Sequence, residues 1–203
     1  MEKYNFIGKT KEEAISKAIE ELKCEEKDLF YKEVDSKSGL FKSKKIEIEA
    51  VTKKQIIEES KSFLKNIINL MGIEVNFEVK EREDTTIITA FCENNNILIG
   101  KQGRTLNSLS LVLKQYLHNE LGFNFNFILD AGDYKLKNQK RLERLGKQLA
   151  REVIKTKVEV KLDPMNSYER RIIHTILSEN KKVKTESIGE EPNRCVVIKP
   201  IEE

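Results

Sequence analysis

Apolar and polar residues recur along the chain with two different spacings, and each spacing predicts its own kind of element. Apolar side chains three and four residues apart predict helices, whereas strict alternation predicts strands. The helical spacing covers residues 11–22, 53–71, 95–99, 104–121, 134–156 and 164–178. Alternation or short apolar runs cover residues 3–7, 30–34, 46–49, 73–79, 87–91, 123–129, 158–160, 183–188 and 195–198. A loop is expected over residues 36–43.

The order of these elements divides the chain into three modules. Residues 1–52 follow the order β-α-β-β, residues 53–131 follow α-β-β-α-α-β, and residues 132–203 follow α-β-α-β-β. The joins between modules leave linkers of only a few residues. We therefore predict an α+β protein built from three small modules, each with its own sheet.

Composition narrows the class of protein. Of the 203 residues, 38% are hydrophobic and 35% are charged, which favours small units with much surface over one large buried sheet. No apolar run approaches the roughly 18 residues of a spanning helix, so no stable membrane insertion is expected. The charged N-terminus shows no secretory signal. The three cysteines, Cys24, Cys92 and Cys195, form no C-x-x-C pair, so neither a disulfide framework, a metal site nor a cofactor is expected. A reducing cytoplasm is the expected compartment.

Positive charge gathers in the last module. Residues 1–52 and 53–131 each carry a net charge of −1. Residues 132–203 carry 17 lysines and arginines against 12 acids, a net charge of +5. A basic module on a nearly neutral chain indicates a polyanionic partner for that module.

Two glycines between two predicted helices form the first candidate site. The segment reads Ile99, Gly100, Lys101, Gln102, Gly103 and Arg104. Glycines let the backbone approach a sugar-phosphate chain, and the N-terminus of the following helix favours phosphate. This G-x-x-G spacing within the order α-β-β-α-α-β is typical of the phosphate-clamping loop of a type II KH domain. The alternative is an ordinary glycine-containing turn, and no P-loop pattern is present.

A pair of residues near the C-terminus forms the second candidate site. Arg170 and His174 lie four residues apart on a predicted helix and so share one face, with Arg171 beside them. We expect this face to be exposed and suited to phosphate and base contacts, and we expect Tyr168, Ile172 and Ile176 to form the buried stripe. The alternative is a solvated helix face with a structural histidine.

The helix predicted over residues 134–156 carries a basic stripe opposite its leucines. The stripe contains Lys137, Arg141, Arg144, Gln148, Arg151 and Lys155. Because acids are nearly absent from this helix, a track for a polyanion is favoured over an ordinary solvated face. A membrane-surface helix is the rival, but the apolar side lacks Trp and Phe, so a core role is favoured.

Catalytic patterns are absent from the sequence. His118 and His174 are the only histidines, and neither has a cysteine or histidine at metal-ligand spacing. Neither a nucleophile elbow nor an H-E-x-x-H pattern occurs. No catalytic residue is therefore predicted.

Several stretches resemble one family, the Jag or SpoIIIJ-associated family, also called KhpB or EloR. Residues 37–41 (Lys-Ser-Gly-Leu-Phe), within the β-α-β-β module, resemble its N-terminal domain, and residues 98–106 resemble its KH segment. Residues 164–174 (Pro-Met-Asn-Ser-Tyr-Glu-Arg-Arg-Ile-Ile-His) resemble its R-x-x-x-H domain. Residues 187–194, which end at Arg194, are similar to the final hairpin of that domain.

The resemblance implies a bacterial, cytoplasmic regulator that binds single-stranded RNA, or single-stranded DNA, and is linked to cell elongation and division. It implies a small single-KH partner, KhpA, and a homodimer is a further expected form. By position, residues 100–103 would clamp the RNA backbone, while Arg170 and His174 would bind single-stranded nucleic acid. Arg171, Arg141, Arg144, Arg151 and Arg194 complete the expected contacts. The long linker with a regulatory phosphothreonine that some relatives carry is not found here, because a helix starts near residue 53.

These expectations assign residues 1–52 to a Jag N-terminal domain, residues 53–131 to a type II KH domain and residues 132–203 to an R-x-x-x-H domain. The rival interpretation is a protein–protein adaptor for membrane-associated elongation or insertion factors. The nearly neutral first 130 residues and the absence of tryptophan support the rival.

Overall fold

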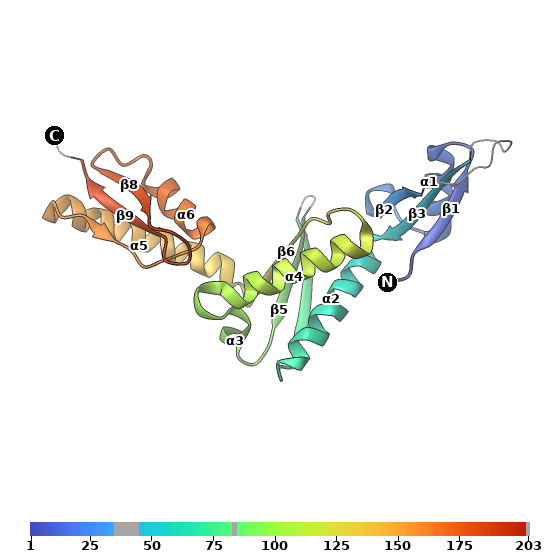
Figure 1. Cartoon of the computed structure of the whole chain (residues 1–203), viewed down its shortest axis with the longest axis horizontal. Helices are drawn as coiled ribbons and strands as arrows, with labels where there is room; N and C mark the ends of the chain where they lie inside the picture. Colours follow the sequence, from blue (N-terminus) through green and yellow to red (C-terminus); the bar gives the residue numbers. More distant parts are fainter. Residues whose placement is uncertain (35–44, 83–84, 202–203) are drawn as a thin grey trace. The chain divides into compact units, whose positions relative to one another are not determined.

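The computed structural model describes residues 1–34, 45–82 and 85–201, and it contains three three-stranded sheets (Figure 1). This confirms the predicted α+β class. Residues 1–129 form one compact unit, which holds the first two sheets, and residues 130–203 form another. The loop expected over residues 36–43 lies outside the described residues. No helix in the described part of the chain is long and apolar enough to cross a membrane.

The first sheet contains β1 (Tyr4–Gly8), β2 (Leu29–Val34) and β3 (Ile46–Thr52) in the order β1-β3-β2, with antiparallel pairing throughout. Helix α1 (Lys11–Leu22) packs on this sheet through Ala14 and Ala18, which lie against Phe6, Leu29 and Ile48. A short 3-10 turn (Glu26–Asp28) leads into β2. The small alanine side chains allow the helix to approach the sheet closely.

The second sheet contains β4 (Asn76–Arg82), β5 (Thr85–Phe91) and β6 (Phe127–Ala131) in the order β4-β5-β6. Helices α2 (Lys53–Leu70) and α4 (Arg104–Leu121) contact each other and bury a row of aliphatic side chains. Helix α3 (Asn95–Ile99) and a 3-10 turn (Lys101–Gly103) connect β5 to α4. The predicted order α-β-β-α-α-β is therefore present.

Strand β6 begins four residues later than the alternation of residues 123–129 suggests. Phe123 and Phe125 instead contact Phe30 of β2, with ring centroids 5.9 and 5.5 Å apart. The alternating apolar residues of this segment therefore pack on the first sheet before the strand begins. This aromatic cluster joins the two sheets of residues 1–129.

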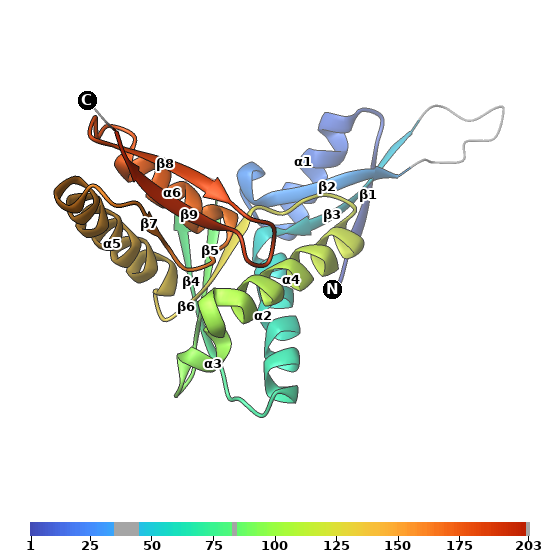
Figure 2. The ribbon, with the colours of Figure 1, turned by 60° about the vertical axis from the view of Figure 1, so that its left-hand side comes forward.

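The third sheet contains β7 (Val160–Lys161), β8 (Val183–Ile188) and β9 (Cys195–Pro200) in the order β7-β9-β8. Helices α5 (Tyr134–Thr156) and α6 (Ser167–Leu177) pack against each other and share a core with the sheet (Figure 2). At Gly146 of α5, an added Cβ would lie 3.3 Å from Ile173 and 3.4 Å from Ile176. Glycine at this position therefore allows α5 and α6 to approach closely.

Helix α6 starts later than predicted, and a different residue caps it. Asp163 and Pro164 were expected to begin the helix, but its N-cap is Asn166, whose side-chain oxygen accepts from the Glu169 backbone N–H at 3.0 Å. The Glu169 carboxylate accepts from the Asn166 backbone N–H at 3.2 Å and from the amide of Asn138 in α5 at 2.7 Å. The α5 contact holds the start of α6 at this capping box.

The cap predicts how two substitutions will differ. Asn166→Ala should destabilise α6 by about 1 kcal/mol, because an orphan backbone N–H loses its acceptor, and so speed hydrogen exchange of the first α6 amides about fivefold. Asp163→Ala is the matched control and should leave that exchange within twofold. Equal acceleration by both substitutions would contradict the assignment of Asn166 as the cap. Hydrogen–deuterium exchange of the full chain measures both effects.

Candidate nucleic-acid interface

The glycine turn after α3 has a backbone that suits glycine. Gly100 has φ 69° and ψ 178°, and Gly103 has φ 73°. A Cβ on Gly100 would lie 2.1 Å from Thr105 Oγ1, which is far closer than two atoms can pack. Gln102 also has a positive φ of 56°. The glycines are therefore required by the fold of the turn itself, apart from any ligand.

Positive charge surrounds this turn. Lys101 and Arg104 are exposed, and neither forms an ion pair with a described residue. Gly103 is the N-cap of the 18-residue helix α4 and provides no side-chain cap, so the first backbone N–H groups of α4 lack that partner. Ile99 is half-buried at the end of α3. Two cations and a helix N-terminus thus meet at one turn, an arrangement that favours a phosphate.

Helix α5 carries a row of unpaired cations. The predicted basic stripe, which includes Arg141, Arg144 and Arg151, is exposed. None of the nine lysines and arginines over residues 135–157 forms an ion pair within the described residues. Twenty-three residues of helix extend about 35 Å, so these charges form a long positive surface.

Two members of this row have contacts that hold their side chains near the helix. Arg141 donates to Asn138 Oδ1 from Nε at 3.2 Å and from Nη2 at 2.8 Å. Lys135 is half-buried, and burial lowers the pKa of its ammonium group. Lys135 is therefore the least suited of the row to bind an anion at the surface.

The expectation that Arg170 is exposed is wrong. Arg170 is only 7% exposed, and its Nη1 donates to Met165 O at 3.1 Å and to the Glu191 carboxylate at 2.8 Å. The face of α6 that packs inward carries Glu169, Arg170, Ile173 and Leu177. Tyr168, which was expected in the buried stripe, is instead 58% exposed.

His174 is bonded on both sides of its ring. Its Nδ1 lies 2.6 Å from Thr185 Oγ1 and its Nε2 lies 2.8 Å from Ser187 Oγ, both on β8. Burial lowers the pKa of His174, and the positive charge of Arg170 lowers it further. The imidazole is therefore neutral near pH 7 and joins α6 to β8.

Other polar groups of residues 130–203 remain at the surface. Arg171 is exposed on α6, and Arg194 is exposed before β9, where its backbone carbonyl accepts from Met165 N–H at 3.1 Å. The arginines of α5 belong to this same unit, whereas the glycine turn belongs to residues 1–129. The sequence analysis missed Tyr168 as a surface residue. The spacing of Asn166 and Glu169, a capping box, was the signal that could have set the rotation of α6.

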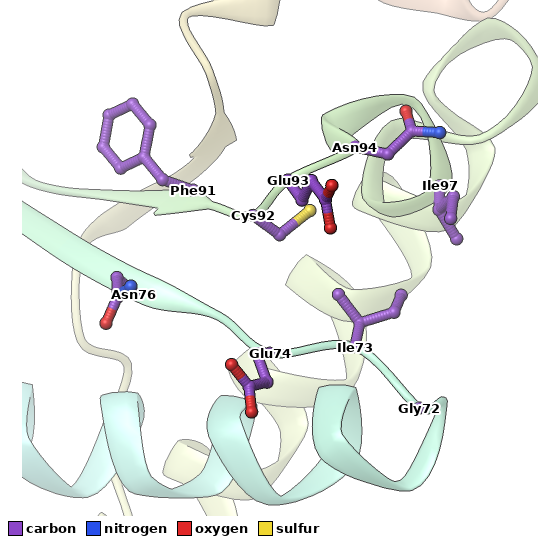
Figure 3. Close-up of a pocket in the computed structure, with 9 residues that line it drawn as sticks. All are labelled: Gly72, Ile73, Glu74, Asn76, Phe91, Cys92, Glu93, Asn94 and Ile97. Atoms are coloured by element: carbon purple, nitrogen blue, oxygen red, sulfur yellow. The ribbon is translucent and has the colours of Figure 1, made fainter.

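A separate cavity of about 530 Å³ opens beside the first turn of α3 (Figure 3). Its lining residues are Gly72, Ile73, Glu74, Asn76, Phe91, Cys92, Glu93, Asn94 and Ile97. The carboxylates of Glu74 and Glu93 give it negative charge, which disfavours phosphate. Among the described residues, no group of three histidine, cysteine or acidic side chains could hold a metal ion. This cavity therefore adds nothing to the phosphate-binding groups of the glycine turn.

Comparison with known proteins identifies the family. The Jag N-terminus matches residues 6–52, and the R-x-x-x-H domain matches residues 140–200. A Clostridium symbiosum protein named RNA-binding protein KhpB is 35% identical over 98% of this chain and 91% of its own length. A Bacillus subtilis protein of the same name is 33% identical over 98% of both chains. These matches confirm the predicted resemblance and show that the chain belongs to the Jag family, also called KhpB.

Proposed function

We propose that this chain binds single-stranded RNA and does so without catalysis. The observation that carries the proposal is the row of exposed cations on α5, which no carboxylate of the described residues neutralises. Elsewhere lysines are commonly paired, as in Lys17 with Glu13 and Lys32 with Glu49. An unpaired row of this length suits a phosphate backbone. The relatives named RNA-binding proteins support the same interpretation.

The glycine turn would provide a second contact. Residues 53–131 have the element order of a type II KH domain, and the turn lies between its two consecutive helices. The first N–H groups of α4, with Lys101 and Arg104, would hold the backbone of about four nucleotides. Two weak contacts on one chain strengthen each other through effective concentration.

Arg170 and His174 would act by positioning other groups. Both are bonded within the fold, Arg170 to Glu191 and His174 to two hydroxyls of β8. They would hold the β8–β9 hairpin against α6, and so keep Arg171 and Arg194 in place at the surface. The direct nucleic-acid contact expected from the family resemblance stays a prediction.

The wider role follows the family resemblance. The chain would act in the cytoplasm with a small KH-domain partner, or as a homodimer, in control of cell elongation and division. The rival function is an adaptor that docks on other proteins. Exposed apolar side chains on α4 favour a protein contact there, since Leu111 is 67% exposed and Val112 is 47% exposed. RNA binding and a protein contact on α4 are compatible.

A salt titration tests the α5 contact. The variant Arg144→Gln, Arg151→Gln and Lys155→Gln removes three exposed charges that no carboxylate of the described residues pairs. With a short single-stranded RNA, the slope of log K against log salt should become about 2 less steep, because each phosphate contact contributes roughly 0.7. Fluorescence anisotropy of the full chain with a labelled RNA measures the slope.

The matched control for charge is the variant Lys11→Gln, Lys17→Gln and Lys27→Gln. These three lysines are exposed and each pairs with a glutamate in residues 1–129. The control should keep the wild-type slope. If both variants lowered the slope equally, the effect would be one of net charge, and the assignment of α5 as the RNA contact would be wrong.

A dipeptide substitution tests the glycine turn. Lys101→Asp with Gln102→Asp keeps both glycines, and Asp tolerates the positive φ of position 102 better than most residues. Phosphate repulsion should weaken RNA binding about tenfold while the melting temperature stays within about 2 °C. Substituting the glycines is a poorer test, because a side chain at Gly100 meets Thr105.

The chain offers a matched dipeptide as control. Lys114 and Gln115 are exposed on α4. Lys114→Asp with Gln115→Asp makes the same change of charge away from the turn and should alter binding less than twofold. Equal loss of affinity in the two variants would remove the support for a KH-type clamp at residues 100–103.

A further inference from the structure

A groove of about 210 Å³ lies between α5 and α6, and the proposed function does not use it. Its lining residues are Gln139 and Glu143 of α5 and Tyr168, Arg171, Ile172, Thr175 and Ile176 of α6. Neither Arg170 nor His174 lines it, because both point from α6 toward the β8–β9 hairpin or β8 itself. The groove is therefore a separate feature of the unit formed by residues 130–203.

One side of the groove presents an aromatic ring above an apolar floor. Ile172 and Ile176 are half-buried and pack on the core of the unit. Tyr168 lies one helical turn before Ile172 and is 58% exposed. Its ring has no aromatic or cation–π contact, and its hydroxyl has no hydrogen bond, within the described residues. An unpartnered ring beside an aliphatic floor suits the flat face of a nucleobase.

The other side of the groove presents a carboxylate that can accept more hydrogen bonds. Gln139 Nε2 donates to Glu143 Oε1 at 2.9 Å, and Oε2 of Glu143 has no partner among the described groups. Adenine, cytosine and guanine carry an exocyclic amino group that can donate to a carboxylate. Uracil lacks this group, and its one N–H lies between two carbonyl oxygens that a carboxylate repels. The groove should therefore favour an amino-bearing base over uracil.

The charges around the groove favour a nucleic acid as the occupant. Arg171 lines the groove, and Lys140 and Lys147 lie three and four residues from Glu143, next to it on the helix surface. All three cations are exposed and form no ion pair with described residues. Cations around a stacking surface match the alternation of phosphates and bases along a single strand. An acidic peptide would supply the negative charge, but its carboxylates would meet Glu143 at the groove.

We propose that the groove between α5 and α6 binds one unpaired, amino-bearing base of the RNA. The base stacks on Tyr168 over Ile172, its amino group donates to Glu143, and an adjacent phosphate meets Arg171. The inference rests on the proposed function, since the base belongs to the strand that follows the cations of α5. It adds a preference among bases, which contacts to phosphates alone do not supply.

Substitution of Tyr168 tests the stacking contact. Tyr168→Ala should weaken binding of the full chain to a seven-nucleotide oligo(C) about tenfold, because the base loses its stacking partner. Tyr168→Phe keeps the ring and should bind within twofold of the wild type. The salt slope should stay the same in both variants, since no phosphate contact is removed.

Substitution of Glu143 tests the choice of base. The wild type should bind oligo(C) more tightly than oligo(U), and Glu143→Gln should reduce this ratio, because an amide can donate to the carbonyls of uracil. Glu152→Gln is the matched control, since Glu152 is the other acid of α5 and does not line the groove. The control should keep the wild-type ratio.

The outcomes separate this inference from the proposed function. Failure of the wild type to bind either RNA would contradict both. Wild-type binding with a clear salt slope, but with Tyr168→Ala indistinguishable from Tyr168→Phe, would overturn the groove as a base site and leave the proposed function standing. A ratio of oligo(C) to oligo(U) affinity that is unchanged by Glu143→Gln would overturn the role of Glu143.

Discussion

The buried carboxylate of Glu169 sets the rotation of α6, and the surface of residues 130–203 depends on that rotation. Glu169 is 3% exposed and is bonded by the Asn138 amide and by the backbone N–H of Asn166. A buried carboxylate without such partners would cost several kcal/mol, so α6 cannot easily turn about its axis. With this rotation, Arg170 faces inward and Tyr168 faces solvent.

Two kinds of cation follow from this arrangement. The guanidinium of Arg170 is neutralised inside the fold by Glu191, where removing either partner would leave a largely buried charge. Those of Arg144 and Arg151 remain at the surface without a carboxylate among the described residues, so a ligand can supply the missing negative charge. The interior pair stabilises the module and the exterior row recruits the strand. Cations of the same residue type thus serve different ends because their surroundings differ.

Local patterns in the sequence predicted much of the fold and part of the candidate site. The glycine turn at residues 100–103 and the basic stripe of α5 depend on spacing within one segment, and both are present. The rotation of α6 depends on the bond between Asn138 and Glu169, which spacing within α6 does not reveal. The late start of β6 depends likewise on Phe123 and its distant partner Phe30.

The most direct test of this account is NMR of the full chain, labelled at arginine and histidine side chains, during titration with a short single-stranded RNA. The account predicts that the guanidinium signals of Arg144 and Arg151 shift on binding. The signals of Arg170 and of the His174 ring should stay in place, because their partners Glu191, Thr185 and Ser187 remain bonded. Large shifts of Arg170 and His174, with Arg144 and Arg151 unchanged, would contradict it.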